Sequence, residues 1–114
     1  MMNRHFQILE SLLNFNQPLN ELKKNLKTLP WDNENEIIVL KRIHVIKILE
    51  RYINKELNSD EISEWANLIE GREDVGFEQN NEDVLKKVIF EMANPEINGP
   101  LTDYFAVKWI SYLR

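Results

Sequence analysis

The chain has 114 residues, a formal net charge of −5 and no cysteine. This length fits one domain, spanning residues 1–114, that can bury a core without disulfides or metals. The absence of cysteine excludes thiolate chemistry, and only three glycines argue against a turn-rich β architecture. The first residues lack a signal-peptide pattern, and the apolar run at residues 37–40 is far shorter than the roughly 18 residues that cross a membrane. We therefore expect a cytoplasmic, helical protein without a membrane partner.

Two amphipathic helices are predicted in the first 30 residues. The apolar residues of segments 3–14 and 18–29 recur at three- and four-residue steps, which is helical spacing. Pro18 suits the first turn of the second helix, which is expected to end before Pro30. Trp31 follows, and we expect it to fold back against the next helix.

Residues 36–57 form the most hydrophobic segment and predict a central helix. Its apolar residues again follow helical spacing, but they cover more than the arc of roughly 100° that a surface helix needs. We therefore expect other helices to pack on at least two of its sides. His44 lies in mid-helix between apolar neighbours, which favours a core or boundary position over a catalytic one.

Three further helices are predicted at residues 60–70, 81–93 and 104–113. Residues 58–61 offer a capping oxygen and first-turn carboxylates, Gly71 can end the helix in a left-handed conformation, and Thr102 is a candidate cap. Residues 71–80 show no period and are expected to form a loop. The second of these helices carries Val84, Leu85, Val88, Ile89, Phe90 and Met92. The predicted fold class is all-α: an irregular antiparallel bundle of about six helices around the central helix.

The sequence carries no catalytic, metal-binding or cofactor-binding motif. Of the two histidines, His5 lies near the terminus and His44 within the central helix, and no spacing places two metal ligands on one helix face. The glycines form no phosphate-binding pattern. A helix-turn-helix built from residues 36–57 and 60–70 would lack basic residues in its second helix, where phosphate contacts need them. We expect no enzyme activity, no cofactor, no metal and no nucleic-acid partner.

Acidic residues are concentrated in one part of the chain. Residues 59–103 hold twelve acidic and three basic residues, a net charge of −9, whereas the flanking segments are neutral or slightly basic. Such a field repels nucleic acid and attracts cationic partners. The predicted partner-binding residues are carboxylates of this region together with one aromatic anchor: Glu61, Glu64, Glu70, Glu73, Asp74, Phe77, Glu78, Glu82 and Asp83. The alternative is that these carboxylates only solvate helix faces and that Trp65 and Phe77 belong to the core.

A set of spaced segments resembles one class of known proteins. The segments are LPWD at 29–32, VIKILERY at 45–52 with EL at 56–57, WAN at 65–67 with IEGREDVGFE at 69–78, and ANPE at 93–96 with PLT at 100–102. Together they resemble small helical bacterial proteins encoded beside polymorphic and contact-dependent growth inhibition toxins. The pattern covers residues 29–102 and contains no chemical motif.

The resemblance implies an immunity protein, which binds and neutralises the toxin domain of its own system in the cytosol. Such toxin domains are commonly nucleases with basic substrate grooves, and an acidic inhibitor can occupy or flank such a groove. Two alternatives remain at this point. One is a small helical adaptor or regulatory protein that binds another basic partner. The other is an enzyme, which would require His44 and a carboxylate such as Glu50 or Glu70 to line one accessible cleft.

Overall fold

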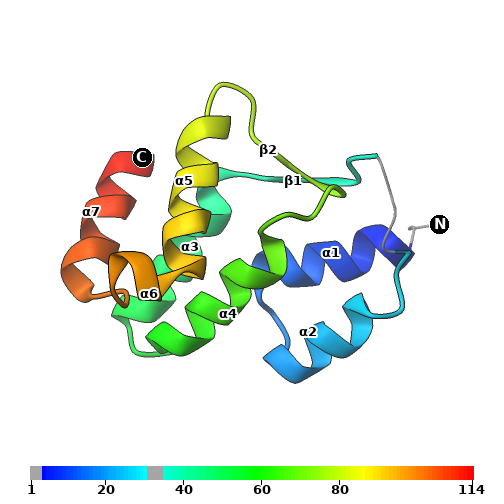
Figure 1. Cartoon of the computed structure of the whole chain (residues 1–114), viewed down its shortest axis with the longest axis horizontal. Coiled ribbons are helices and arrows are strands. Elements are labelled where there is room, and N and C mark those ends of the chain that lie inside the picture. Colours follow the sequence, from blue (N-terminus) through cyan, green and yellow to red (C-terminus); the bar gives the residue numbers. More distant parts are fainter. Residues whose placement is uncertain (1–3, 31–34) are drawn as a thin grey trace.

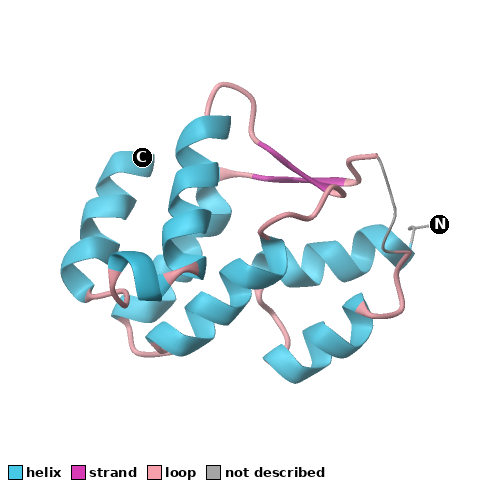
Figure 2. Cartoon of the chain, in the orientation of Figure 1, coloured by secondary structure: helices cyan, strands magenta, loops and turns pink. Residues whose placement is uncertain are grey.

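A computed structural model describes residues 4–30 and 35–114. The fold is all-α, as predicted, apart from one small two-stranded sheet (Figure 2). The elements of the described residues are α1 (Arg4–Asn14), α2 (Leu19–Leu26), β1 (Ile38–Leu40), α3 (Arg42–Ile53), α4 (Ser59–Ile69), β2 (Val75–Phe77), α5 (Glu82–Ala93), α6 (Pro95–Asn98) and α7 (Asp103–Leu113). The expected position of Trp31 lies outside the described residues.

The helices form two groups joined by α4. In Figure 1, the pair α1 and α2 lies at one end of the molecule, and α3, α5 and α7 lie toward the other. Helix α4 packs against α1, α2, α3 and α5, while α7 packs against α3. The sheet lies beside these groups, at the upper right of Figure 1, and connects the start of α3 with the end of α4.

Local signals place most helix ends where the sequence predicts them. Asn58 Oδ1 accepts a hydrogen bond from Glu61 N at 2.8 Å, and Glu61 Oε1 accepts one from Asn58 N at 3.0 Å, which caps α4. Gly71 takes a left-handed conformation, with φ +80°, after the same helix. Thr102 Oγ1 accepts from Phe105 N at the start of α7. These residues therefore confirm the predicted boundaries of the two helices.

The predicted helix at residues 36–57 is wrong at both ends. Only Arg42–Ile53 is helical, and Ile38–Leu40 is strand β1. A run of four apolar residues fits a buried strand as well as a helix, so periodicity cannot separate the two. Pairing decides between them, because β1 runs parallel to β2, with Val39 opposite Gly76. The partner strand lies within residues 71–80, which are therefore not simply a loop.

The short connection after residue 93 also contains a helical turn, α6. Pro95 occupies its first position, where its missing N–H and fixed φ are favourable. The described residues thus contain one more helix than the six expected. Within that same part of the chain, no helix is both long enough and apolar enough to cross a membrane.

Trp65 of α4 is the largest fully buried side chain and connects the two helix groups. Its ring is completely inaccessible to solvent, and its Nε1–H donates to the carbonyl oxygen of Leu12 in α1 at 2.7 Å. The surrounding core includes Leu9, Leu49 and Leu85, each at 0% exposure. Trp65 is therefore a core residue, as the alternative interpretation of the acidic region expected, whereas Phe77 is only half-buried.

Replacing Trp65 with Phe should lower the free energy of unfolding by about 1–3 kcal/mol, because it removes the buried hydrogen bond from Trp65 to Leu12 and leaves a cavity where the larger ring lay. The measurement is urea unfolding followed by far-UV circular dichroism. The matched control is Trp109→Phe, since Trp109 is only partly buried. Equal destabilisation by the two variants would contradict the role assigned to the Trp65 hydrogen bond.

Candidate functional site

The structure divides the predicted partner-binding residues among several places. Glu70, Glu73 and Phe77 line one groove. Glu82 and Asp83 line a second groove, between α5 and α7. The remaining members of the set, Glu61, Glu64, Asp74 and Glu78, each have a partner within the chain. The nine residues therefore do not form one continuous acidic face.

The first groove lies between β2, the segment that precedes it, and α5, and we call it the β2–α5 groove. It has a volume of about 630 Å³. Its lining consists of Glu36, Glu70, Gly71, Arg72, Glu73, Val75, Gly76, Phe77, Lys86, Ile89 and Phe90. It brings together residues from three separate parts of the chain: Glu36, residues 70–77 and residues 86–90.

Two aromatic side chains, Phe77 and Phe90, line the β2–α5 groove. Phe77 is half-buried against the core, and Phe90 is 46% exposed. The Lys86 Nζ atom lies 5.7 Å from the centre of the Phe77 ring, within range of a cation–π contact. Exposed aromatic surface beside charged groups is typical of protein interfaces. Phe77 thus lies in one groove with two of the predicted carboxylates, Glu70 and Glu73, although it is not fully exposed.

Carboxylates outnumber free cations at the rim of this groove. Glu36 and Glu73 are exposed and Glu70 is half-buried. Arg72 is paired with the carboxylate of Asp74, so Lys86 is the other cation of the lining, against the three carboxylates. The rim therefore carries negative charge that a cationic side chain of a partner could pair with.

The proposed binding surface includes Glu36 and Phe90, which were not among the predicted residues. Glu36 reaches the groove because β1 pairs with β2, a contact between distant segments that the sequence does not signal. Phe90 was grouped with the apolar residues of its helix. At 100° per residue it falls off the buried stripe of Leu85, Val88, Ile89 and Met92. A helical wheel would have placed Phe90 toward solvent.

Asp74 corrects the predicted set, because it is buried. Its side chain is 4% exposed and accepts two hydrogen bonds from Arg72, each at 2.9 Å. His5 Nε2 of α1 lies 2.9 Å from the second carboxylate oxygen. A carboxylate in the interior requires such partners, since an unpaired buried charge is strongly unfavourable. Asp74 is therefore a structural residue and is not available to a partner.

The pKa of Asp74 lies below its ordinary value of 3.8. Burial alone would raise it, but the hydrogen bonds from Arg72 and His5, together with their charges, outweigh that effect. The carboxylate is consequently ionised throughout the neutral range. His5, expected only as a residue near the terminus, is thereby connected to the segment before β2.

Other predicted carboxylates have local roles. Glu61 caps α4, and Glu64 accepts from Lys23 of α2 at 2.7 Å on the surface. Glu78 accepts from the side chain of Arg42 at 2.9 Å and from its backbone N–H at 3.1 Å. These hydrogen bonds from Arg42 hold the pKa of Glu78 below its usual value. Glu78 thus stabilises the start of α3.

His44 lies at the boundary of the core, as predicted. Its Nδ1 accepts a hydrogen bond from Lys41 N at 2.9 Å, at the start of α3. Burial, followed by the charges of Lys41 and Lys47, lowers its pKa below 6.5. Glu50 lines a groove between α3 and α7, whereas Glu70 lines the β2–α5 groove, and His44 lines neither. Those two grooves do not supply the arrangement that the enzyme alternative requires.

Among residues 4–30 and 35–114, no group of three His, Asp or Glu side chains is arranged to hold a metal ion. Comparison of the chain with protein-family models, with curated protein sequences and with solved structures finds no significant match. The functional argument therefore rests on the residues of this chain.

Replacing Asp74 with Ala should lower the free energy of unfolding by about 2–3 kcal/mol at neutral pH, because it removes charge-assisted hydrogen bonds. The adjacent Glu73→Ala is the control and should change it by less than about 0.5 kcal/mol. The contribution of Asp74 is present above pH 3.8 and is lost as the pH falls through its lower folded-state pKa. Denaturant unfolding across this range measures both effects, and equal values for the two variants would contradict them.

The wild-type chain should also lose stability relative to His44→Gln on acidification. Glutamine keeps an acceptor for Lys41 N but does not titrate. Because the folded-state pKa of His44 lies below 6.5, the unfolded chain binds the proton first, and stability falls as the pH decreases from 6.5 to the folded value. Unfolding midpoints at about pH 7 and about pH 5 measure this difference. Parallel pH profiles for the two proteins would show that His44 does not contribute.

Proposed function

We propose that this protein is an immunity protein that neutralises the toxin domain of a bacterial contact-dependent or polymorphic toxin system by stoichiometric binding. The observation that carries the proposal is the β2–α5 groove, whose lining combines Phe77 and Phe90 with three carboxylates, Glu36, Glu70 and Glu73. The resemblance of residues 29–102 to such proteins supports the same function. Binding takes place in the cytoplasm and requires no chemistry by this chain.

The composition of the groove matches what a tight protein complex needs. Aromatic side chains supply most of the binding free energy when a partner excludes water from them. Rim carboxylates contribute mainly to the rate of association with a basic surface and to its specificity. Phe90, at 46% exposure, still has surface to lose on binding. A basic nuclease surface is complementary to this arrangement.

The segment that carries Glu70 and Glu73 is held in place before binding. Gly71 ends α4, and the buried Asp74 anchors the following residues to Arg72 and His5. A fixed interface loses less conformational entropy on association than a mobile one. The rim carboxylates are therefore presented in a defined geometry to the partner.

The complex would inhibit the toxin by excluding its substrate. An acidic surface seated on or beside a basic groove removes the positive field that nucleic acid needs to bind. The same surface could serve an adaptor with a different basic partner, and the gene adjacent to this one separates the two functions. An adjacent toxin gene whose product forms a complex supports the immunity function, while a complex with a housekeeping protein alone contradicts it.

The direct test uses the purified product of the neighbouring toxin gene, in a catalytically disabled form. Isothermal titration calorimetry should show a one-to-one complex with the wild-type chain, and no complex at micromolar concentrations would overturn the proposal. Reversing two rim charges, with Glu70→Lys and Glu73→Lys together, should slow association by about tenfold or more at low ionic strength. Stopped-flow measurements at several salt concentrations should also show a weaker salt dependence.

The matched control reverses two carboxylates that lie away from the groove, Glu21 of α2 and Glu96 of α6, both of which are exposed. It changes the net charge by the same amount. Similar rates for the rim variant and the control would show that overall charge, and not this groove, governs association. Asp74 is left intact in both variants, and far-UV circular dichroism checks that each retains its fold, since Glu70 also accepts a hydrogen bond from Asn94 at 3.3 Å.

A further inference from the structure

Helix α7 exposes an apolar surface that the proposed function does not use. Its buried residues form one narrow stripe, Ala106, Ile110 and Leu113, which packs toward α3. On the remaining faces, Tyr104 is 71% and Tyr112 is 69% exposed. A helix in contact with solvent on these faces would normally carry polar residues there.

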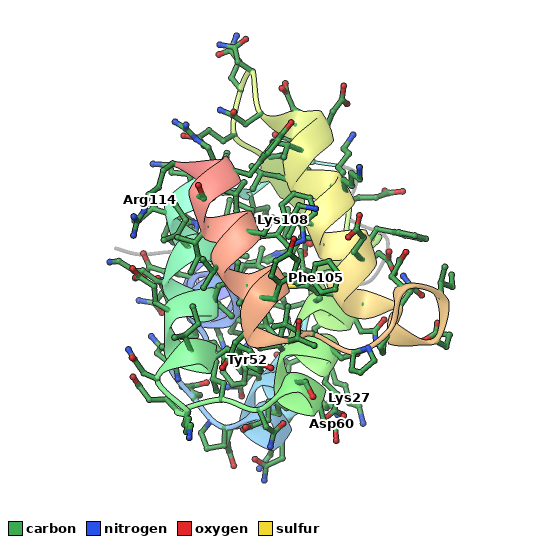
Figure 3. All side chains as sticks on the ribbon, turned by 90° about the vertical axis from the view of Figure 1, so that its left-hand side faces the viewer. Lys27, Tyr52, Asp60, Phe105, Lys108 and Arg114 are labelled. Carbon is green, nitrogen blue, oxygen red and sulfur yellow. The ribbon has the colours of Figure 1, made fainter. Side chains whose placement is uncertain are left out.

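A groove of about 1020 Å³ runs between α5 and α7. We call it the α5–α7 groove. Its α7 wall presents Phe105, Trp109 and Tyr112, with Lys108 among them. Figure 3 looks onto α7 with α5 beside it, and Phe105 and Lys108 lie on the side of α7 that faces α5. The Trp109 and Tyr112 rings pack edge to face, with their centres 5.8 Å apart.

The two walls of this groove carry opposite net charges. The α5 wall contributes three carboxylates and two lysines, for a net charge of −1: Glu82, Asp83, Glu91, Lys86 and Lys87. The α7 wall contributes Lys108 alone, for a net charge of +1. The groove as a whole is neutral, although the chain carries −5. It neither attracts a strongly basic partner nor repels another acidic chain.

We propose that the α5–α7 groove is a homodimer interface, in which α7 of each copy packs into the groove of the other. A two-fold contact places each surface against its counterpart on the second copy. The positive α7 wall then meets the negative α5 wall twice, and the aromatic side chains of both copies are removed from water. Over the rest of the surface, two chains with the same negative charge would repel each other.

The test measures the molar mass of the full chain alone, by sedimentation equilibrium over a range of concentrations. The wild-type chain should approach twice the monomer mass of 13.6 kDa. A wild-type chain that stays monomeric up to its solubility limit would overturn the proposal, even if the groove captured another protein. This measurement does not involve a toxin, so its failure leaves the proposed function untouched.

Charge reversal locates the interface within the dimer. Lys108→Glu gives both walls a net charge of −1, and Glu91→Lys gives both walls +1, so each variant alone should shift toward monomer. An equimolar mixture of the two should regain dimer, because every contact then pairs opposite charges. Ile43→Ser is the control, since Ile43 is a 49% exposed apolar residue outside the groove. Variants that dimerise like wild type, or a mixture that stays monomeric, would show that the contact lies elsewhere.

Discussion

The buried carboxylate of Asp74 is the interaction on which the geometry of the proposed binding surface depends. Its side chain is held by Arg72 and by His5 of α1, and its backbone carbonyl accepts a hydrogen bond from Ile37 N at 2.8 Å. One residue thereby connects α1, the end of α4 and the entry to β1. Removing Arg72 would leave the carboxylate of Asp74 without its cation in a nearly dry position, which is costly. The segment between α4 and β2 is consequently fixed from three directions.

This constraint gives neighbouring carboxylates opposite roles. Glu73 and Asp74 are adjacent, yet Glu73 is exposed at the rim of the β2–α5 groove and Asp74 is 3% exposed. Glu70 stands on the other side of Gly71, at the end of α4. The short sheet completes the arrangement, because β1 brings Glu36 to the same rim. The proposed site is thus a product of tertiary contacts among segments that are far apart in the sequence.

The helices could be predicted because their signals are local. Apolar spacing placed α1, α4, α5 and α7 near their observed ends, and the Asn58, Gly71 and Thr102 caps acted as expected. The strand at Ile38–Leu40 could not be predicted, since its hydrogen bonds go to residues 74–78 across two intervening helices. Three residues are too few to show a period.

Only part of the candidate site could be predicted from the sequence, because some of its contacts are again between distant segments. Glu70, Glu73 and Phe77 lie close together in sequence and also in the structure. Charge density along the chain, however, does not distinguish a carboxylate that faces solvent from one paired with a residue elsewhere. Asp74 meets His5 across 69 positions of sequence, and Glu78 meets Arg42 across 36. The acidic segment therefore contains carboxylates that line the groove, one that caps α4 and one that is buried in the core.

The central claim is that a basic protein partner covers the β2–α5 groove. Hydrogen–deuterium exchange of the wild-type chain, with and without the product of the adjacent toxin gene, tests it most directly. The account predicts that the partner slows exchange in peptides covering residues 70–77 and 86–90, while α1 and α2 are unaffected. Slower exchange confined to α2, α6 or α7, with no change in residues 70–77, would contradict it.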